Sequence, residues 1–212
     1  VLYNFDTTRK VNLSMMINHS KSVRTGVKKS LMIVDLPFNT YKNKLQALKN
    51  CKKIIKETKC DGIKLEGGSK IKDIIKHLVN NKIPVMGHIG ITPQSQRGRF
   101  RYKGKTEKEK KNLLKDSKIL EEAGVFAIVL ECIEKKLSKK ITETIEIPTI
   151  GIGSSKFCDG QILVLDDLLG LTNSKIKFVK KYANFKSNIR NAVKKFGSDV
   201  KRGSYPSLKH SY

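Results

Sequence analysis

Lys64 and Glu66 stand two positions apart at the end of a short apolar run, and two glycines follow them. Because alternate residues of a β-strand share one face, a strand here would place the cation and the carboxylate side by side. Glycine at the strand exit allows a tight turn and lets a ligand approach the backbone. Burying an unpaired ion is strongly unfavourable. This face is therefore either an internally paired core pair or the wall of a polar site that holds a charged ligand or a metal ion.

Polar side chains close three further apolar runs, at Asp35, His88 and Glu131. Asp35 could cap a turn, but with Glu66 it would offer the hard oxygen ligands that Mg²⁺ prefers. His88 could donate a hydrogen bond to a substrate or be satisfied inside the core. Glu131 could serve as a general base or pair with a neighbouring lysine. The residue types alone leave each of these alternatives open.

The elements that must position these residues alternate along the chain. Apolar runs predict strands, and apolar residues at helical spacing predict helices. The expected strands cover residues 31–35, 62–66, 83–88, 126–131, 147–153 and 162–165. The expected helices cover residues 11–23, 41–57, 69–81, 107–123, 135–144 and a C-terminal segment at about 178–202. Residues 92–106 show little periodicity and are expected to form a long loop.

This alternation predicts an α/β fold with parallel strands and right-handed crossovers. A (β/α)₈ barrel and a doubly wound sheet both satisfy it. Polar residues at successive strand ends favour the barrel, whose site is built at one face from several strand ends. About six strands are expected here, fewer than the eight of a closed barrel. A barrel would therefore lack one or two strands, most plausibly at the N-terminus.

The chain has 212 residues, a formal net charge of +25 and a pI near 10.0. Such a charge is typical of nucleic-acid binding. The lysines are spread singly or in pairs over many expected helices, however, which instead favours solvated helix faces and argues against a nucleic-acid partner. The sequence contains no apolar run long enough to predict a membrane span. The cysteines show no C-x-x-C spacing, which fits a reducing cytoplasm better than a disulfide framework or a zinc site.

Ordered motifs connect these residues to a known family. They are VDLPF at 34–38, IKLEGG at 63–68, GHIGITPQ at 87–94, LEC at 130–132, GIG at 151–153 and DGQILV at 159–164. The order and content of these motifs closely resemble the ketopantoate hydroxymethyltransferase family. The resemblance continues to the tail, with GSYP at 203–206 and HS at 210–211.

The resemblance implies a (β/α)₈ TIM barrel of the phosphoenolpyruvate-mutase-like kind, usually assembled as a homodecamer. It implies transfer of a hydroxymethyl group from 5,10-methylenetetrahydrofolate to 3-methyl-2-oxobutanoate, giving 2-dehydropantoate on the route to pantothenate and coenzyme A. Asp35 and Glu66 match Mg²⁺ ligands, and Asp35 and Lys64 match residues that bind the keto acid. Glu131 matches the proton acceptor and His88 an active-site histidine. Mg²⁺ would stabilise the enolate of the keto acid, and we hypothesise that the loop at 92–106 orders over the site.

The family pattern also includes an upstream Gly-Asp-Ser motif that would lie before Val1. We therefore expect residues 1–212 to be one partial barrel domain of an N-terminally truncated copy, ending in a C-terminal helix and a polar tail. Weak metal binding and little activity of these residues alone would follow. Two rival functions remain: another Mg²⁺–enolate enzyme such as a 2-oxo acid lyase, and a catalytically inactive scaffold or basic nucleic-acid binder.

Overall fold

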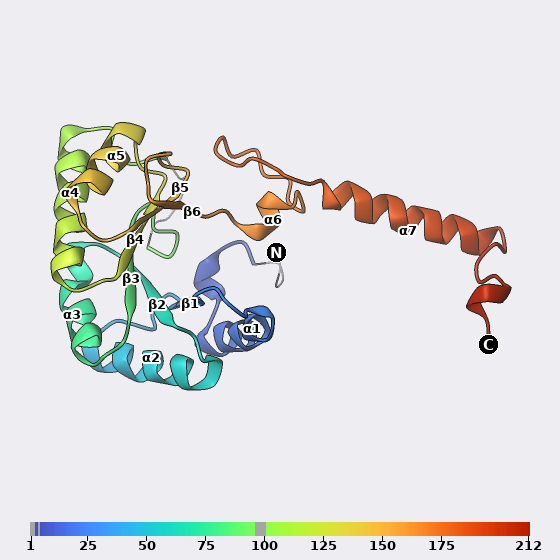
Figure 1. Cartoon of the computed structure of the whole chain (residues 1–212), viewed down its shortest axis with the longest axis horizontal. Helices are drawn as coiled ribbons and strands as arrows, with labels where there is room; N and C mark the ends of the chain where they lie inside the picture. The colour runs from blue at the N-terminus through green and yellow to red at the C-terminus, as the bar shows by residue number, and fades with distance from the viewer. Residues whose placement is uncertain (1–2, 4, 96–100) are drawn as a thin grey trace. The chain divides into compact units, whose positions relative to one another are not determined.

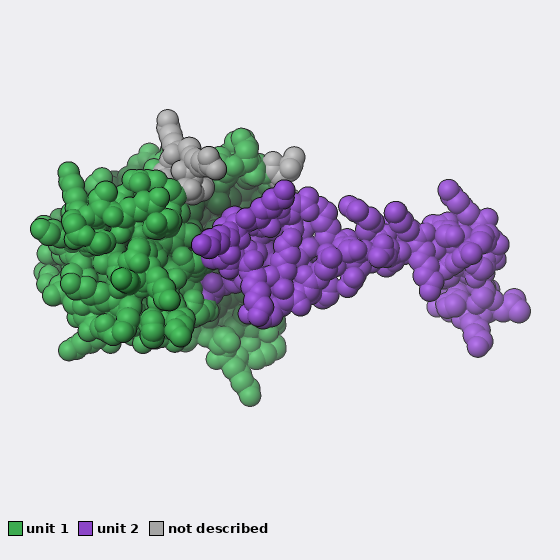
Figure 2. Space-filling view, turned by 90° about the horizontal axis from the view of Figure 1, so that it is seen from above, with its two compact units in different colours: residues 1–161 green, residues 162–212 purple. Residues whose placement is uncertain are grey.

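The computed structural model of the chain describes residue 3 and residues 5–95 and 101–212. It contains two compact units, residues 1–161 and residues 162–212 (Figure 2). The first unit holds the sheet and all the residues predicted to form the site. No helix among the described residues has both the length and the apolar character needed to cross a membrane.

The described part of the first unit has one sheet of six parallel strands, paired in chain order. The strands are β1 (Ile33–Asp35), β2 (Gly62–Glu66), β3 (Val85–Gly90), β4 (Ala127–Glu131), β5 (Thr149–Ile152) and β6 (Gly160–Gln161). The sheet curls into a half-barrel (Figure 1). Because neighbouring strands run in the same direction, all their carboxyl ends meet at one edge, where the predicted site residues lie.

Helices of the first unit cover the outer side of this sheet (Figure 1). They are α1 (Leu13–Gly26), α2 (Lys44–Thr58), α3 (Lys72–Asn80), α4 (Glu107–Glu122) and α5 (Lys135–Thr144), with short 3-10 turns η1 (Thr8–Lys10) and η2 (Ser69–Ile71). Side-chain caps determine where several of these helices begin. Asn43 accepts a hydrogen bond from the Gln46 amide at the start of α2, and Thr106 accepts one from the Glu109 amide at the start of α4. Such caps satisfy backbone donors that the first helical turn leaves free.

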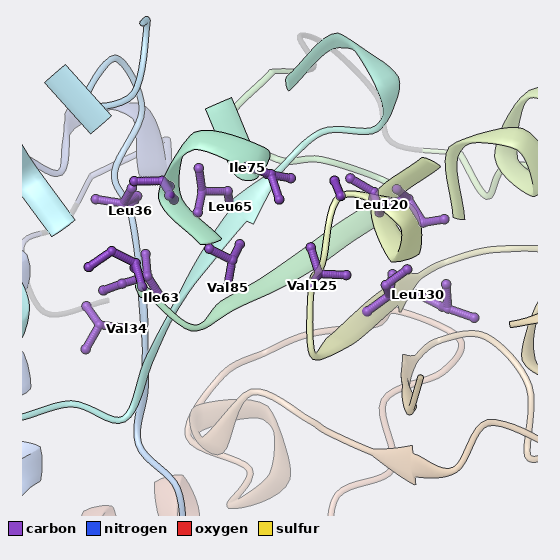
Figure 3. Close-up of a cluster of buried hydrophobic side chains, with 14 of the residues drawn as sticks. Val34, Leu36, Ile63, Leu65, Ile75, Val85, Leu120, Val125 and Leu130 are labelled. Atoms are coloured by element: carbon purple, nitrogen blue, oxygen red, sulfur yellow. The ribbon is translucent and has the colours of Figure 1, made fainter. Parts of the chain in front are cut away.

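The hydrophobic core lies between the sheet and these helices. Ile63 and Leu65 of β2 are fully buried in it, beside Val34, Val85 and Leu120 (Figure 3). Since side chains alternate across a strand, Lys64 and Glu66 face the inner, concave side of the curled sheet. Packing of the apolar pair therefore fixes the orientation of the ionic pair.

The second unit contains α6 (Leu165–Leu168), α7 (Phe185–Lys201) and the 3-10 turn η3 (Leu208–His210). The strand expected at 162–165 is wrong: β6 ends at Gln161, and the carbonyl of Val164 accepts hydrogen bonds that turn the chain into α6. A short apolar run alone does not distinguish a strand from a helical turn. The helix expected at about 178–202 begins at Phe185, where Asn184 accepts a hydrogen bond from the Ser187 amide.

Helix α7 presents large apolar side chains that are exposed. They recur at intervals of three or four residues, which places them along one side of the helix. These residues are Phe185, Ile189, Val193, Phe196 and Val200.

Candidate active site

A continuous chain of polar contacts crosses the carboxyl ends of four neighbouring strands. Lys64 on β2 places Nζ 3.0 Å from Asp35 Oδ1 on β1 and 3.2 Å from His88 Nδ1 on β3. His88 Nε2 in turn lies 3.1 Å from Glu131 Oε2 on β4. Strand register produces this order, because Asp35 pairs with Lys64 and Glu66 with His88. The structure thus brings together all five residues singled out from the sequence.

Glu66 is the most deeply placed carboxylate of the group, with 4 % of its surface exposed. Its Oε2 accepts a hydrogen bond from the Gln94 amide at 3.0 Å, and its Oε1 lies 4.0 Å from His88 Nδ1. Burial raises the pKa of Glu66 to about 7, although the nearby Lys64 charge and the Gln94 amide both oppose that rise. The environment therefore lacks the positive charge needed to compensate this carboxylate fully.

His88 is buried in the same cluster, and burial lowers its pKa below the usual range despite the contact with Glu131. The ring is therefore neutral at physiological pH. With Lys64 donating to Nδ1, the contacts assign the ring proton to Nε2, on the side of Glu131. The Nε2 and Oε2 atoms are close but not aligned as a hydrogen bond. His88 thus lies against Glu131 without adding a positive charge to the site.

Gln94 links the two carboxylates, a role that the sequence did not reveal. Its Nε2 donates to the Leu36 carbonyl at 2.9 Å and to Asp35 Oδ2 at 3.4 Å, while its backbone amide holds Glu66. The Tyr41 hydroxyl, whose pKa is raised by burial, donates to Gln94 Oε1 at 3.1 Å. Gln94 ends the GHIGITPQ motif at 87–94, and this motif is the sequence signal that could have pointed to a role for Gln94. Its contacts span 59 positions, and spacing along the chain could not show them.

The residues at this edge fit a divalent cation with a preference for oxygen. Asp35 Oδ1 is buried, and no donor in the described part of the chain is aligned on it as a hydrogen bond. Gln94 contacts Glu66 through its backbone amide and Asp35 through its side-chain Nε2, and after burial the charge of Asp35 also helps to raise the pKa of Glu66, so the two carboxylates lie near each other. The described residues contain no cluster of three potential metal-ligating His, Cys, Asp or Glu side chains. Two carboxylates completed by water or substrate oxygens match the usual coordination of Mg²⁺.

The glycine pair after Glu66 has a steric reason that differs from the one expected. A Cβ atom on Gly68 would lie 2.2 Å from the carboxylate of Asp116 on α4. That carboxylate accepts a hydrogen bond from the Ser69 amide at 2.9 Å. A side chain of the protein, rather than a ligand, therefore approaches the backbone here. The hypothesis that the loop at 92–106 orders over the site falls partly on residues 96–100, which lie outside the described residues.

Replacing Glu66 by glutamine should stabilise the metal-free protein at neutral and alkaline pH. A carboxyl whose folded pKa is raised from 4.5 to about 7 contributes stability below pH 4.5 that is lost as pH rises through 7. The loss reaches up to about 3 kcal/mol. Glu66→Gln should remove it, so the difference in unfolding free energy between variant and parent should grow from pH 4.5 to 8. Urea unfolding in EDTA measures this; a difference that is independent of pH would contradict the assignment.

Replacing Gln94 by alanine should weaken Mg²⁺ binding without unfolding the protein. The variant keeps the backbone bond to Glu66 but loses the side-chain contacts with Asp35, Leu36 and Tyr41. Loss of such supporting contacts typically lowers metal affinity about 10–100-fold. Calorimetric titration with Mg²⁺ tests this, with Gln46→Ala as the matched control because the side chain of Gln46 forms its hydrogen bonds with the backbone of Asn39 and Lys42 near the start of α2. Equal affinities of the two variants would show that Gln94 does not position the carboxylates.

The sequence matches a known enzyme family over nearly its whole length. The profile of the ketopantoate hydroxymethyltransferase family matches residues 1–208. The 3-methyl-2-oxobutanoate hydroxymethyltransferase of Pelagibacter ubique is 60% identical over 212 residues, covering 100% of this chain and 82% of that protein. The enzyme of the same name from Helicobacter pylori is 46% identical over 213 residues, covering 99% and 79%.

Solved structures show the same fold at much lower identity. Phosphonopyruvate hydrolase aligns with a TM-score of 0.53 at 12% identity, covering 95% of this chain and 74% of that one. The 2,3-dimethylmalate lyase of the PEP mutase/isocitrate lyase superfamily aligns with a TM-score of 0.51 at 12% identity, covering 94% and 70%. These likenesses concern the fold alone. The sequence matches over the full chain show that this chain belongs to the ketopantoate hydroxymethyltransferase family.

Proposed function

We propose that this chain transfers a hydroxymethyl group from 5,10-methylenetetrahydrofolate to 3-methyl-2-oxobutanoate, giving 2-dehydropantoate for pantothenate and coenzyme A synthesis. Membership of the family supports the reaction, and the relatives carry the name of this enzyme. The observation that carries the proposal is the row of Asp35, Lys64, His88 and Glu131 contacts across four strand ends, with Glu66 beside it.

In this proposal Glu131 accepts the proton from carbon 3 of the keto acid. Its side chain is partly exposed, so a substrate can reach it, and its Oε2 lies 3.1 Å from His88 Nε2. Water adds to the one-carbon unit as its two bonds to folate nitrogens break, which releases tetrahydrofolate with both nitrogens protonated and leaves the unit at the oxidation level of formaldehyde. The electron pair left on carbon 3 then forms the new bond to that carbon, and the oxygen takes the proton held by Glu131 to give the hydroxyl group of the product. Proton transfer to a positioned side chain contributes about 10²–10⁴-fold to such rates.

Asp35 and Glu66 would hold Mg²⁺ between the ends of β1 and β2. When bound there, Mg²⁺ supplies Lewis-acid stabilisation of negative charge on the keto oxygen. Lys64 holds a second positive charge at the same edge, where Asp35 keeps its ammonium group in place. Lys64 would also bind the keto acid itself by donating to its carboxylate and keto oxygens, and Asp35 would contact the keto acid through the shared Lys64 ammonium group and the Mg²⁺ ion.

The test is a product assay with the whole chain, Mg²⁺, 3-methyl-2-oxobutanoate and 5,10-methylenetetrahydrofolate, with 2-dehydropantoate measured by mass spectrometry. The proposal expects a product whose formation requires both the folate and the metal. Cleavage of a carbon–carbon bond in a 2-oxo acid without folate would instead identify a lyase. Steeply salt-dependent DNA binding, with no binding of Mg²⁺ and keto acid together, would identify the basic binder.

We further propose that residues 1–212 act as one domain of a (β/α)₈ barrel and that the protein works in the cytoplasm. The curled six-stranded sheet supports the barrel. Four cysteines without a disulfide are consistent with a reducing compartment.

We propose a homo-oligomer, with the decamer of the family as the expected size. The exposed apolar side of α7 supports it, because unpartnered apolar surface of this kind marks interaction sites. Val193→Asp should then shift the protein to smaller species in light scattering, since a charge would enter an apolar contact. The exposed polar change Lys194→Asp, next to it on the helix, serves as control. An unchanged mass for Val193→Asp would exclude α7 from the assembly.

A further inference from the structure

A cavity lined mainly by lysines lies where α4 and α5 begin. Its volume is about 630 Å³, and its walls include Lys105, Lys110, Lys111, Lys136 and Lys140. Two glutamates also line it, Glu107 and Glu134. The lining therefore carries a net charge of +3, from five lysines against two glutamates.

The positive charges from the two helices act on the same space. Lys140 on α5 helps to lower the pKa of Glu107 on α4, after the larger effects of Lys110 and Lys111. Lys110 on α4 likewise helps to lower the pKa of Glu134, the cap of α5. A lysine of each helix therefore lies near the N-terminus of the other helix. The partial positive charges of both helix N-termini add to this field.

Most of the positive charge is not neutralised by the protein. Lys110 pairs with Glu107 at 2.6 Å, and Glu134 is occupied by the amides of Lys136 and Leu137. Within the described residues, Lys111, Lys136 and Lys140 form no ion pair and are exposed to solvent. This cavity is therefore suited to a flexible ligand that carries several negative charges.

The cavity lies close to the proposed proton acceptor along the chain. Glu134 on its wall follows Glu131 by three residues, a span of at most about 11 Å. Two backbone hydrogen bonds of 2.8 Å fix the path of the chain between Glu131 and Glu134. The Lys103 amide donates to the Cys132 carbonyl, and the Glu134 amide donates to the Lys103 carbonyl. A ligand with its reactive end at Glu131 and an extended anionic tail can therefore reach the lysines.

We infer that this lysine cavity binds the oligo-γ-glutamate tail of the folate co-substrate, an inference that rests on the proposed function. A folate carries its one-carbon unit on the pteridine and its glutamate residues at the opposite end, and each added glutamate contributes one carboxylate. The second cavity, of about 430 Å³, suits the tail less well: it offers Lys70 and Lys115 but also the Asp116 carboxylate. The lysine cavity therefore favours long tails by electrostatic attraction, while the pteridine end binds elsewhere.

The test compares 5,10-methylenetetrahydrofolate with one and with five glutamates on the whole chain. The parent should show a lower KM for the pentaglutamate, by about tenfold at low salt, and the preference should shrink at high salt. Lys111→Gln/Lys140→Gln should lose most of this preference, because its KM for the pentaglutamate should rise toward its KM for the monoglutamate. Lys76→Gln/Lys118→Gln, which removes the same charge from exposed positions on α3 and α4, should keep the preference.

Equal KM values for both tail lengths in the parent would overturn the inference, as would an equal loss of preference in the control variant. Absence of turnover with either folate would contradict the proposed function instead. In that case, calorimetry compares the affinities of the chain for tetrahydrofolate monoglutamate and pentaglutamate and so tests directly whether the lysine cavity binds the glutamate tail. Tighter binding of the pentaglutamate that disappears only in Lys111→Gln/Lys140→Gln supports the site, and equal binding refutes it.

Discussion

Glu131→Gln should nearly abolish loss of the carbon-3 proton from 3-methyl-2-oxobutanoate. The substitution keeps the shape of the side chain at the end of β4 but removes the proton acceptor beside His88 Nε2. We expect exchange of this hydrogen for deuterium to slow by about 10²–10⁴-fold relative to the parent chain. Nuclear magnetic resonance of the keto acid in D₂O with Mg²⁺ and no folate measures this step alone.

A matched control is Glu122→Gln, which makes the same change at the exposed end of α4 and should leave exchange unaltered. Binding of the keto acid should survive in Glu131→Gln, because Asp35, Lys64 and Glu66 are intact. Exchange within about threefold of the parent rate would remove Glu131 from the proposed chemistry. The base would then have to be sought among the other groups at this edge of the sheet.

Strand-end chemistry could be predicted from the sequence because two simple periodicities determine it. Alternation along β2 separates Ile63 and Leu65, which enter the core, from Lys64 and Glu66, which face the concave side. Parallel pairing then brings the end of each strand to one edge, so Asp35 reaches Lys64. Both steps need only local patterns and the carboxyl-end rule for parallel sheets.

Contacts made by loops could not be predicted in this way. Gln94 follows β3 but returns to Asp35 and Leu36 near β1, and only the path of the folded loop brings these groups together. The apolar run at 162–165 also led to a wrong prediction of a strand. These residues continue past the end of β6, but the backbone turns into α6. Periodicity identifies faces of regular elements, whereas capping bonds and loop paths depend on tertiary contacts.

Lys64→Met should lower kcat/KM for the keto acid by about 10²–10³-fold, the usual effect of removing one group that stabilises a developing oxyanion. Methionine preserves the unbranched stem but lacks the ammonium group that lies 3.0 Å from Asp35 and 3.2 Å from His88. Steady-state kinetics at saturating Mg²⁺ measures the change. Lys70→Met, on the 3-10 turn after β2, removes an exposed lysine of the same type and should have little effect.

The same variant distinguishes a catalytic lysine from a purely structural partner of Asp35. If Lys64 only neutralised Asp35, a bound Mg²⁺ would compensate that carboxylate instead, and Lys64→Met would keep most of the parent kcat at saturating Mg²⁺. If Lys64 also stabilises charge on the substrate, kcat stays low at every Mg²⁺ concentration. Lys64→Arg should restore binding more than turnover, since guanidinium keeps the charge but not the compact ammonium geometry. Recovery of kcat at saturating Mg²⁺ in Lys64→Met would restrict Lys64 to the ion pair and leave the oxyanion to Mg²⁺ alone.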